Sequence, residues 1–383
     1  MLRFVLISIA IFGALNFVTI SQLIRIHPRR RSLVIAIAVI CNVMWLFIPW
    51  LNTRTDFLRA VRAVFGPPWF AWLCFVLVYP VVALLVFVTK SHWPSRIFLW
   101  GTLIALVIGV YTALVPLDVE RVPIVISNAP PTRIVIIADL HIGLFTRPSR
   151  LRQIFATTAA LSPDVVLLAG DLVDDDPYFV PKLLDGVRSL PPTTPLLAVL
   201  GNHEMYGQPL EFIARLRGSR VRLLVNEGIS VIPTLSASEL PRVPRPSRPL
   251  ADARGDNGTG LWFAGLSDYA ASIPALRPNF EAALANRPAA MFPTVVAHQP
   301  RAFAEAIKRG LPLTLCAHTH GGQFGFRALH WSLAGLFLPY HIGLYRRGAS
   351  QLYVNTGTGY WLLPWRIGVT PEITLIELRP SSR

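Results

Sequence analysis

Cysteine is scarce in this chain, which holds three cysteines among 383 residues. Cys41 and Cys74 lie in apolar runs, and Cys316 lies in a segment typical of a buried strand. Small secreted domains that depend on disulfides carry closely spaced pairs of cysteines, and no pair here indicates a disulfide framework. The low count also weighs against a strongly oxidising compartment.

Charged side chains are few as well, at 15% of the chain, and basic residues outnumber acidic ones by 36 to 21. The hydrophobic fraction of 53% and the mean hydropathy of +0.49 exceed the values of ordinary soluble domains. The basic residues are scattered without interleaved aromatics, so nucleic acid is not expected as a partner. The positive net charge suits an anionic surface or substrate instead.

The apolar excess lies almost entirely before residue 118, in four runs that lack interior charge apart from Arg3. Each run approaches the roughly 20 residues that a helix needs to cross a hydrocarbon core. Buried helices of a soluble bundle are the alternative, but the runs lack a polar face. No small-residue cleavage site follows the first run, which argues against a signal peptide. We therefore expect a transmembrane helical region over residues 1–120, with spans at about 2–24, 32–51, 69–89 and 97–117.

The basic residues of the loops indicate on which side of the membrane the rest of the chain lies. Four arginines lie in the first loop (residues 25–31), and Lys90 and Arg96 lie in the third. Positive loops tend to face the cytoplasm. Arginines on the opposite side nearly balance this count, but the first loop is the densest cluster. We therefore expect an integral protein of the cell membrane whose remaining chain lies outside the cytoplasm.

From residue 133 onward, buried apolar segments alternate with helical ones, which predicts an α/β domain over residues 130–380. Residues 236–260 are rich in proline, arginine and glycine without periodicity, so we expect a flexible surface insertion there. Five apolar segments each end in Asp, Asn or His: RIVIIADLH, PDVVLLAGDL, LLAVLGNHE, TVVAHQP and LPLTLCAHTH.

These strand ends carry ligand-type residues that would converge on one rim of the domain. Any one of them could be an ordinary polar residue at a strand end, but five ends of this kind are improbable by chance. Imidazole, carboxylate and amide oxygen without thiolate suit a divalent ion of intermediate hardness. The candidates are Asp139, His141, Asp171, Asn202, His203, His298, His318 and His320.

The order and type of these residues resemble the calcineurin-like metallophosphoesterases. The segments GGQ after His320, LYVNTGTG (352–359) and PEITLIEL (371–378) resemble a subgroup of that family that often has membrane segments before its catalytic domain. That family has D-x-H, G-D, G-N-H-[DE], a single His and G-H-x-H in this order. The chain has DLH, GD, GNHE, His298 and AHTH, so Ala317 stands where the family usually has glycine. The resemblance covers roughly residues 130–380.

The resemblance implies a four-layer αββα sandwich with two mixed β-sheets and a centre of two divalent ions. Mn²⁺ is expected first, with iron or Zn²⁺ as alternatives. One ion would be held by Asp139, His141 and His320, the other by Asn202, His298 and His318, with Asp171 bridging both. A hydroxide that bridges the ions would attack phosphorus, and His203 would act as general acid at the leaving group. Glu204 would support the turn, and Asp174–Asp176 would be a solvated helix start.

The substrate is less constrained by the sequence. Residues 326–348 are rich in aromatic side chains, and two interpretations fit this composition. The first is ordinary core followed by a loop, and the second is an apolar lip that docks on a bilayer. In the second case Arg346 and Arg347 would meet lipid phosphate. We expect a phospholipid or lipid-linked substrate and membrane lipids as partners. The alternatives are soluble nucleotides or phosphomonoesters with the spans as an anchor, a transport or sensing unit, and a non-catalytic metal-binding scaffold.

Overall fold

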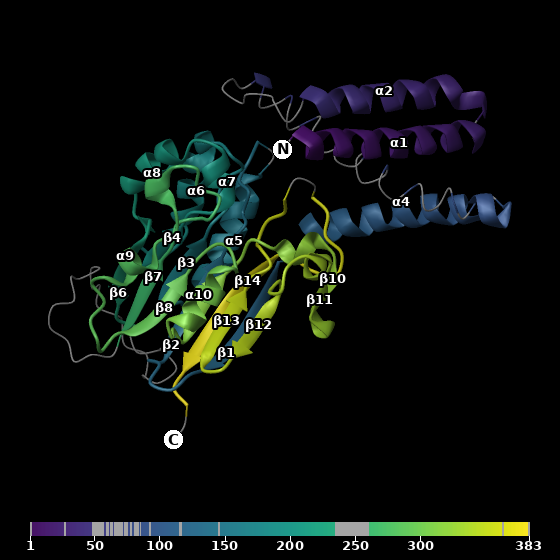
Figure 1. Cartoon of the computed structure of the whole chain (residues 1–383). Coiled ribbons are helices and arrows are strands. Elements are labelled where there is room, and N and C mark those ends of the chain that lie inside the picture. The colour runs from purple at the N-terminus through teal and green to yellow at the C-terminus, as the bar shows by residue number, and fades with distance from the viewer. Residues whose placement is uncertain are drawn as a thin grey trace. The chain divides into compact units, whose positions relative to one another are not determined.

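The computed structural model describes residues 2–47, 86–114, 117–233 and 260–381, apart from residues 27, 92, 145, 362 and 363. It also describes scattered residues between 48 and 85. The chain divides into two units, Met1–Gly109 and Val110–Arg383 (Figure 1).

The first unit is helical. Helix α1 (Leu2–Ile26), the 3-10 turn η1 (Pro28–Arg30) and helix α2 (Arg31–Phe47) follow one another, and α4 (Trp93–Leu114) continues past the unit boundary. These helices coincide with three of the four predicted spans. The predicted span at 69–89 lies largely outside the described residues. Among the residues that the structure describes, no helix combines the length and the apolar content that crossing a membrane requires.

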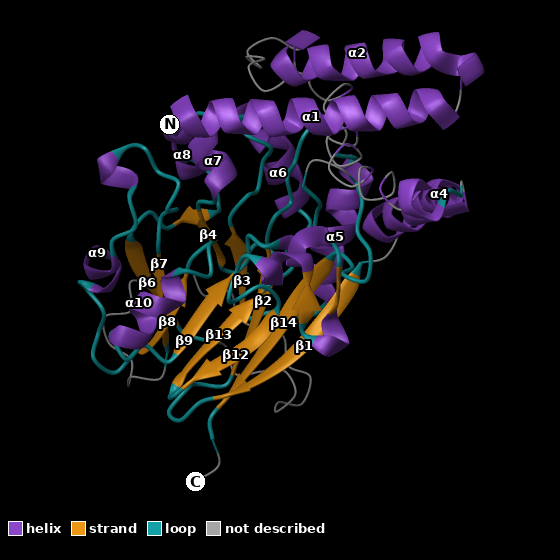
Figure 2. Cartoon of the chain, turned by 45° about the vertical axis from the view of Figure 1, so that its right-hand side comes forward, coloured by secondary structure: helices purple, strands orange, loops and turns teal. Residues whose placement is uncertain are grey.

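The second unit contains two six-stranded mixed sheets (Figure 2). The first sheet has the order β1 (Asp118–Val125), β14 (Glu372–Arg379), β2 (Thr132–Ile137), β3 (Val165–Ala169), β4 (Leu196–Val199) and β5 (Arg222–Leu223). The second has the order β12 (Gly343–Arg347), β13 (Ser350–Val354), β9 (Leu313–Cys316), β8 (Phe292–Val296), β7 (Leu261–Gly265) and β6 (Glu227–Val231). A small pair, β10 (Gly325–Phe326) and β11 (Trp331–Ser332), lies outside them.

Successive side chains of each strand point to opposite faces of the sheet, so the buried side chains form separate layers of core. Ile134 and Ile136 of β2 join Leu313 and Leu315 of β9 in one buried cluster, so the two sheets face each other. The intervening residues of β2 pack on the opposite side with α5 (Pro148–Ala160), α6 (Val180–Val187) and α8 (Pro209–Arg217). The outer face of the second sheet packs with α9 (Phe280–Leu284) and α10 (Ala302–Lys308).

This arrangement confirms the predicted αββα sandwich with two mixed sheets. The first strand of the sheet, β1, pairs with β14 from Asp118 onward, before the predicted domain start at about residue 130. The register of this pair could not be predicted, since its two strands lie at opposite ends of the domain sequence. The predicted flexible insertion at 236–260 lies, up to residue 259, outside the described residues.

Candidate metal centre

The rim formed by the carboxyl ends of the parallel strands holds an unusual concentration of strained backbone. β2, β3 and β4 run parallel in one sheet, and β8 and β9 run parallel in the other. Five residues that follow these strands have left-handed φ angles, which residues other than glycine rarely adopt outside functional sites. They are Asp139 (51°), His141 (42°), Asp171 (50°), His318 (77°) and His320 (49°).

The first group at this rim comprises Asp139, His141 and His320, all buried. Nε2 of His141 lies 3.0 Å from Nε2 of His320, which lies 3.5 Å from Oδ1 of Asp139. That carboxylate oxygen is buried and has no hydrogen-bond partner. A buried carboxylate oxygen without a donor is costly, so its environment fits a bound cation.

The second group comprises Asn202, His298 and His318. Nε2 of His298 lies 3.2 Å from Oδ1 of Asn202 and 3.3 Å from Nδ1 of His318. Nδ1 of His298 lies 2.8 Å from the carbonyl oxygen of Ala169. A carbonyl only accepts, so Nδ1 of His298 is the protonated nitrogen in the neutral ring and Nε2 presents its lone pair to the group.

Asp171 lies between the two groups. Its Oδ2 is 3.8 Å from Nε2 of His141 and 3.1 Å from Nε2 of His298. Its Oδ1 accepts a hydrogen bond of 2.9 Å from the backbone N–H of His203. One carboxylate therefore contacts both sets of potential ligands.

The electrostatics differ among the imidazoles. Burial and the nearby His203 lower the pKa of His141 to about 3, and burial and His298 lower the pKa of His318 to about 3, so these rings are unprotonated as metal binding requires. Burial alone would lower the pKa of His298, but the charge of Asp171 and its hydrogen bond raise it well above the ordinary value. Burial raises the pKa of Asp139 to about 7, because it removes water from around the charge.

His203 lies at the start of α7 (Asn202–Tyr206) and belongs to neither group. Its Nδ1 lies 2.6 Å from Oδ1 of Asp175. Burial alone would lower the pKa of His203, but the close contact with the Asp175 carboxylate and the charge of Asp171 raise it to about 9. The ring is thus protonated near neutral pH, with its Nδ1 facing Asp175.

Comparison with known proteins agrees with this geometry. The model of the family described as calcineurin-like phosphoesterase matches residues 132–322, which include every ligand candidate above. Phosphodiesterase YaeI of Escherichia coli is 30% identical over 262 residues, covering 66% of this chain and 84% of that protein. This chain belongs to the calcineurin-like phosphoesterase family.

Two further relatives cover most of the same region. A protein of Danio rerio named transmembrane protein with metallophosphoesterase domain is 30% identical over 292 residues, covering 73% of this chain. An uncharacterized metallophosphoesterase of Helicobacter pylori is 26% identical over 279 residues, covering 72% of this chain. The chain spans 61% and 67% of the lengths of these two relatives.

Two glycines of the family motifs lie where any side chain would clash with a candidate ligand. A Cβ on Gly201 would lie 2.1 Å from Oδ1 of Asp171, and one on Gly170 would lie 2.6 Å from Nδ1 of His298. Ala317, where the family usually has glycine, is buried in the core between the sheets and has no left-handed φ. Its methyl group is therefore accommodated, and the departure from the family pattern leaves the turn intact.

Glu204 links the turns that follow β3 and β4. Its Oε1 accepts hydrogen bonds from the backbone N–H groups of Leu172 and Val173, and its Oε2 accepts from those of Asp171 and Gly201. All four distances lie between 2.7 and 3.2 Å. The supporting role that the sequence predicts for Glu204 is thus visible as a clamp on two ligand-bearing turns.

The acidic run Asp174–Asp176 is more than the solvated helix start that the sequence predicts. Asp176 does cap η3 (Pro177–Phe179), through a hydrogen bond from the N–H of Tyr178. Asp175 instead contacts His203. Three consecutive carboxylates give no local signal of which one turns inward.

Arg366 is a further residue of the centre that the sequence does not reveal. It is fully buried, and its Nη2 lies 3.0 Å from Nδ1 of His320. Its Nη1 donates to the carbonyl oxygen of Thr356 at 2.8 Å. Its surroundings in the sequence, PWRIGV, are those of an ordinary loop arginine.

Arg346 and Arg347 are not brought to this centre. Gly343 is opposite Val354, which is opposite Cys316 at the ligand end of β9. Arg346 is opposite Gln351, which is opposite Leu313 at the other end of β9. The hairpin therefore runs away from the rim, and the prediction that these two arginines meet lipid phosphate stays a prediction.

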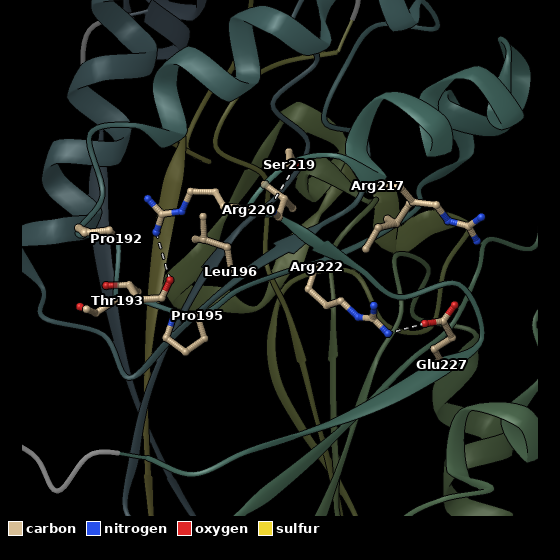
Figure 3. A pocket seen from close by; sticks show the side chains of 12 residues that line it. Pro192, Thr193, Pro195, Leu196, Arg217, Ser219, Arg220, Arg222 and Glu227 are labelled. Carbon is tan, nitrogen blue, oxygen red and sulfur yellow. Dashed lines mark hydrogen bonds and ion pairs between the residues drawn. The ribbon is translucent and has the colours of Figure 1, made fainter. Parts of the chain in front are cut away.

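A hollow of about 550 Å³ lies at the amino end of β4, away from the metal-ligand rim (Figure 3). Arg220 within it donates to the carbonyl oxygens of Leu190, Pro191 and Thr194. Arg222 pairs with Glu227 at 2.9 Å. These arginines are occupied by partners within the protein, so the hollow does not compete with the rim as a catalytic site.

Proposed function

We propose that this protein is a phosphoester hydrolase that depends on two divalent metal ions. The observation that carries the proposal is the position of Asp171 between the two groups of potential ligands. Asp139, His141 and His320 would hold one ion, Asn202, His298 and His318 the other, with Asp171 shared. The nitrogen and oxygen donors suit Mn²⁺, with iron or Zn²⁺ as alternatives.

When bound, such ions polarise phosphoryl oxygens and provide a strong nucleophile from water at neutral pH. The chain supplies the remaining proton chemistry through His203. Asp175 holds Nδ1 of this ring and raises its pKa to about 9, so Nε2 carries a proton at neutral pH. His203 would donate this proton to the oxygen of the leaving group.

Metal removal and one conservative substitution test this proposal. Full-length protein stripped of metal should not hydrolyse an aryl phosphodiester, and Mn²⁺ should restore turnover. Asp171→Asn should remain inactive with Mn²⁺, because it lacks the shared charge. Asp185→Asn, at an exposed carboxylate on α6, is the matched control and should behave as wild type. Activity of Asp171→Asn close to that of the control would contradict the two-ion proposal.

We further propose that the substrate is a phospholipid or lipid-linked phosphoester and that the chain is attached to the cell membrane, with the catalytic unit outside the cytoplasm. Support comes from the four apolar runs before residue 118 and from the exposed apolar side chains after the ligand turn. The printed names of the Danio rerio and Escherichia coli relatives refer to a transmembrane protein and a phosphodiesterase. Soluble nucleotides or phosphomonoesters, with the apolar runs as an anchor, are the alternative.

A comparison of two substrates decides between these possibilities. Mn²⁺-loaded protein in detergent is given an aryl phosphodiester or a mixed lipid extract, with Asp171→Asn as the blank. Release of phosphate or headgroup from lipid above the aryl rate would support the lipid substrate. Aryl hydrolysis without lipid turnover would favour a water-soluble substrate.

A further inference from the structure

Residues 324–338, which follow the ligand turn directly, form what we call the apolar lobe. It contains the β10–β11 pair and two 3-10 turns, η6 (Arg327–Leu329) and η7 (Leu333–Leu336). Seven large apolar side chains of the lobe are exposed, and Phe337 reaches 81% exposure. They are Phe326, Leu329, Trp331, Leu333, Leu336, Phe337 and Leu338. Soluble surfaces scatter such side chains singly, so their concentration within one short segment marks an interaction surface.

The lobe is joined tightly to the turn that carries His320. Gly322 has a left-handed φ of 61°, and a Cβ there would lie 2.5 Å from the backbone nitrogen of Ala334 in the lobe. The N–H of Leu333 donates to the carbonyl oxygen of Phe324 at 2.8 Å. These contacts fix the position of the lobe relative to the candidate metal centre.

A second loop extends this apolar surface toward His203. Gln323 joins the two loops, because its side chain accepts from the N–H of Trp361 at 2.8 Å and donates to the carbonyl oxygen of Trp361 at 3.2 Å. The ring of Trp361 lies 6.5 Å from the ring of His203. The ring of Trp365 stacks with that of Phe324, with 6.4 Å between centroids. An apolar surface thus borders the side of the site where the leaving group would lie.

The architecture of the lobe does not fit the common ways of binding a protein partner. Its longest helical turn, η7, has four residues, and its two strands pair with each other. It therefore offers no helix face, and strands of two residues are too short to pair with a strand of a partner. Phe, Leu and Trp on short protruding turns instead resemble side chains that insert into the boundary between headgroups and acyl chains.

The charge of the surrounding chain indicates the same kind of partner. No Asp or Glu occurs between Glu305 and Glu372, whereas six Lys or Arg residues do. A bilayer that contains anionic lipids would meet no carboxylate from this segment, and the positive net charge of the chain would favour its approach.

We propose that the apolar lobe docks into the interface of an anionic lipid bilayer and holds the metal centre at the phosphoester of a membrane lipid. The docking stands on the exposed side chains, the absence of carboxylates and the rigid junction at Gly322. The choice of substrate rests in addition on the proposed hydrolase function.

The test measures lipid contact without turnover, so that its failure differs from a failure of the proposed function. In the full-length chain, Cys41 and Cys74 are replaced by serine, and Phe337→Cys carries an environment-sensitive fluorophore. Cys316 stays because it is buried. Leu210→Cys on α8, also exposed, carries the same probe as the matched control. Detergent is removed in the presence of phosphatidylcholine alone or mixed with phosphatidylglycerol, and with or without lipids that carry a quencher.

The probe at residue 337 should shift its emission to the blue and be quenched by the quencher lipids, more strongly with phosphatidylglycerol, whereas the probe at residue 210 should remain water-like. A water-like probe at residue 337 would overturn the proposal, as would a chain that separates from the lipid. A blue shift without lipid quenching would show contact with protein, such as a second copy, and would equally overturn it. A rise in melting temperature on addition of Mn²⁺ shows that each labelled chain is folded.

Discussion

The two ends of the sandwich strands use charged residues in opposite ways. At the carboxyl ends, Asp139 and Asp171 are buried among imidazoles, and Oδ1 of Asp139 has no hydrogen-bond donor. Near the amino end of β4, Arg220 donates to three backbone carbonyls, and at the edge of the sheets Arg222 and Glu227 pair at 2.9 Å on the surface. One end is incomplete without a ligand, and the other is satisfied by the fold itself.

This difference shows that the charged residues at the carboxyl ends are placed for chemistry and lower the stability of the fold. Buried charge without a partner destabilises a fold, so the carboxyl ends persist because the surrounding sheets hold them in place. The amino ends contribute little, because exposed ion pairs are weak. Substitutions at the two ends should therefore have effects of very different size and kind.

The largest effect at the carboxyl ends should come from His203→Gln, measured as turnover. Loss of the proton donor should lower the rate for an alkyl leaving group by about 10²- to 10⁴-fold. Mn²⁺ binding should persist, because His203 belongs to neither ligand group. The same variant on a 4-nitrophenyl ester, which needs little protonation, is the internal control. An equal loss of turnover with both leaving groups would show that His203 is not the proton donor.

Glu204→Gln should produce the next largest effect, measured as the free energy of unfolding. The amide would place its own N–H groups against backbone N–H groups that now donate to the carboxylate. Leaving such buried donors unsatisfied should cost about 3 to 5 kcal/mol. Urea unfolding of metal-free protein measures this loss in the free energy of unfolding. Glu211→Gln is the control, because Glu211 is an exposed carboxylate paired with Arg215. A loss no larger than that of the control would mean that the clamp does not hold the two turns.

The pH dependence of stability should reveal the charge on His203 in metal-free protein. Because its pKa is raised from 6.5 to about 9, the protonated ring stabilises the fold fully below pH 6.5. This contribution, at most about 3 kcal/mol, is lost as the pH rises through 9. The stability difference between wild type and His203→Gln should therefore shrink from pH 6 to pH 10. A difference that stays constant over this range would show that Asp175 does not raise the pKa.

Arg222→Ala should have the smallest effect. Its pair with Glu227 is exposed on both sides, so the free energy of unfolding should change by less than about 1 kcal/mol. Turnover should be unchanged, because the pair is exposed at the edge of the sheets and includes none of the candidate ligands. A marked loss of activity would break the contrast between the two ends.

The residues of the metal centre could be predicted because each follows its own buried strand in the sequence. Asp139, Asp171 and His318 are signalled by local apolar runs and by neighbouring motif residues. The role of Asp175 and the burial of Arg366 depend on how distant segments meet, for which the sequence offers no local pattern. The same limit applies to Arg346, since the direction of the β12–β13 hairpin decides which end of β9 it approaches.

The oxygen of Asp139 that accepts no hydrogen bond among the described residues has a consequence for the life of the protein in the cell. A cation that binds only the folded chain stabilises it further as the free cation concentration rises, so the folded chain is less stable without the cation than with it. Chains that open more often are cleared sooner by proteases. We therefore expect metal supply to set the abundance of the protein as well as its rate, so that metal starvation shortens its half-life and the Asp139→Asn chain shows little of this dependence.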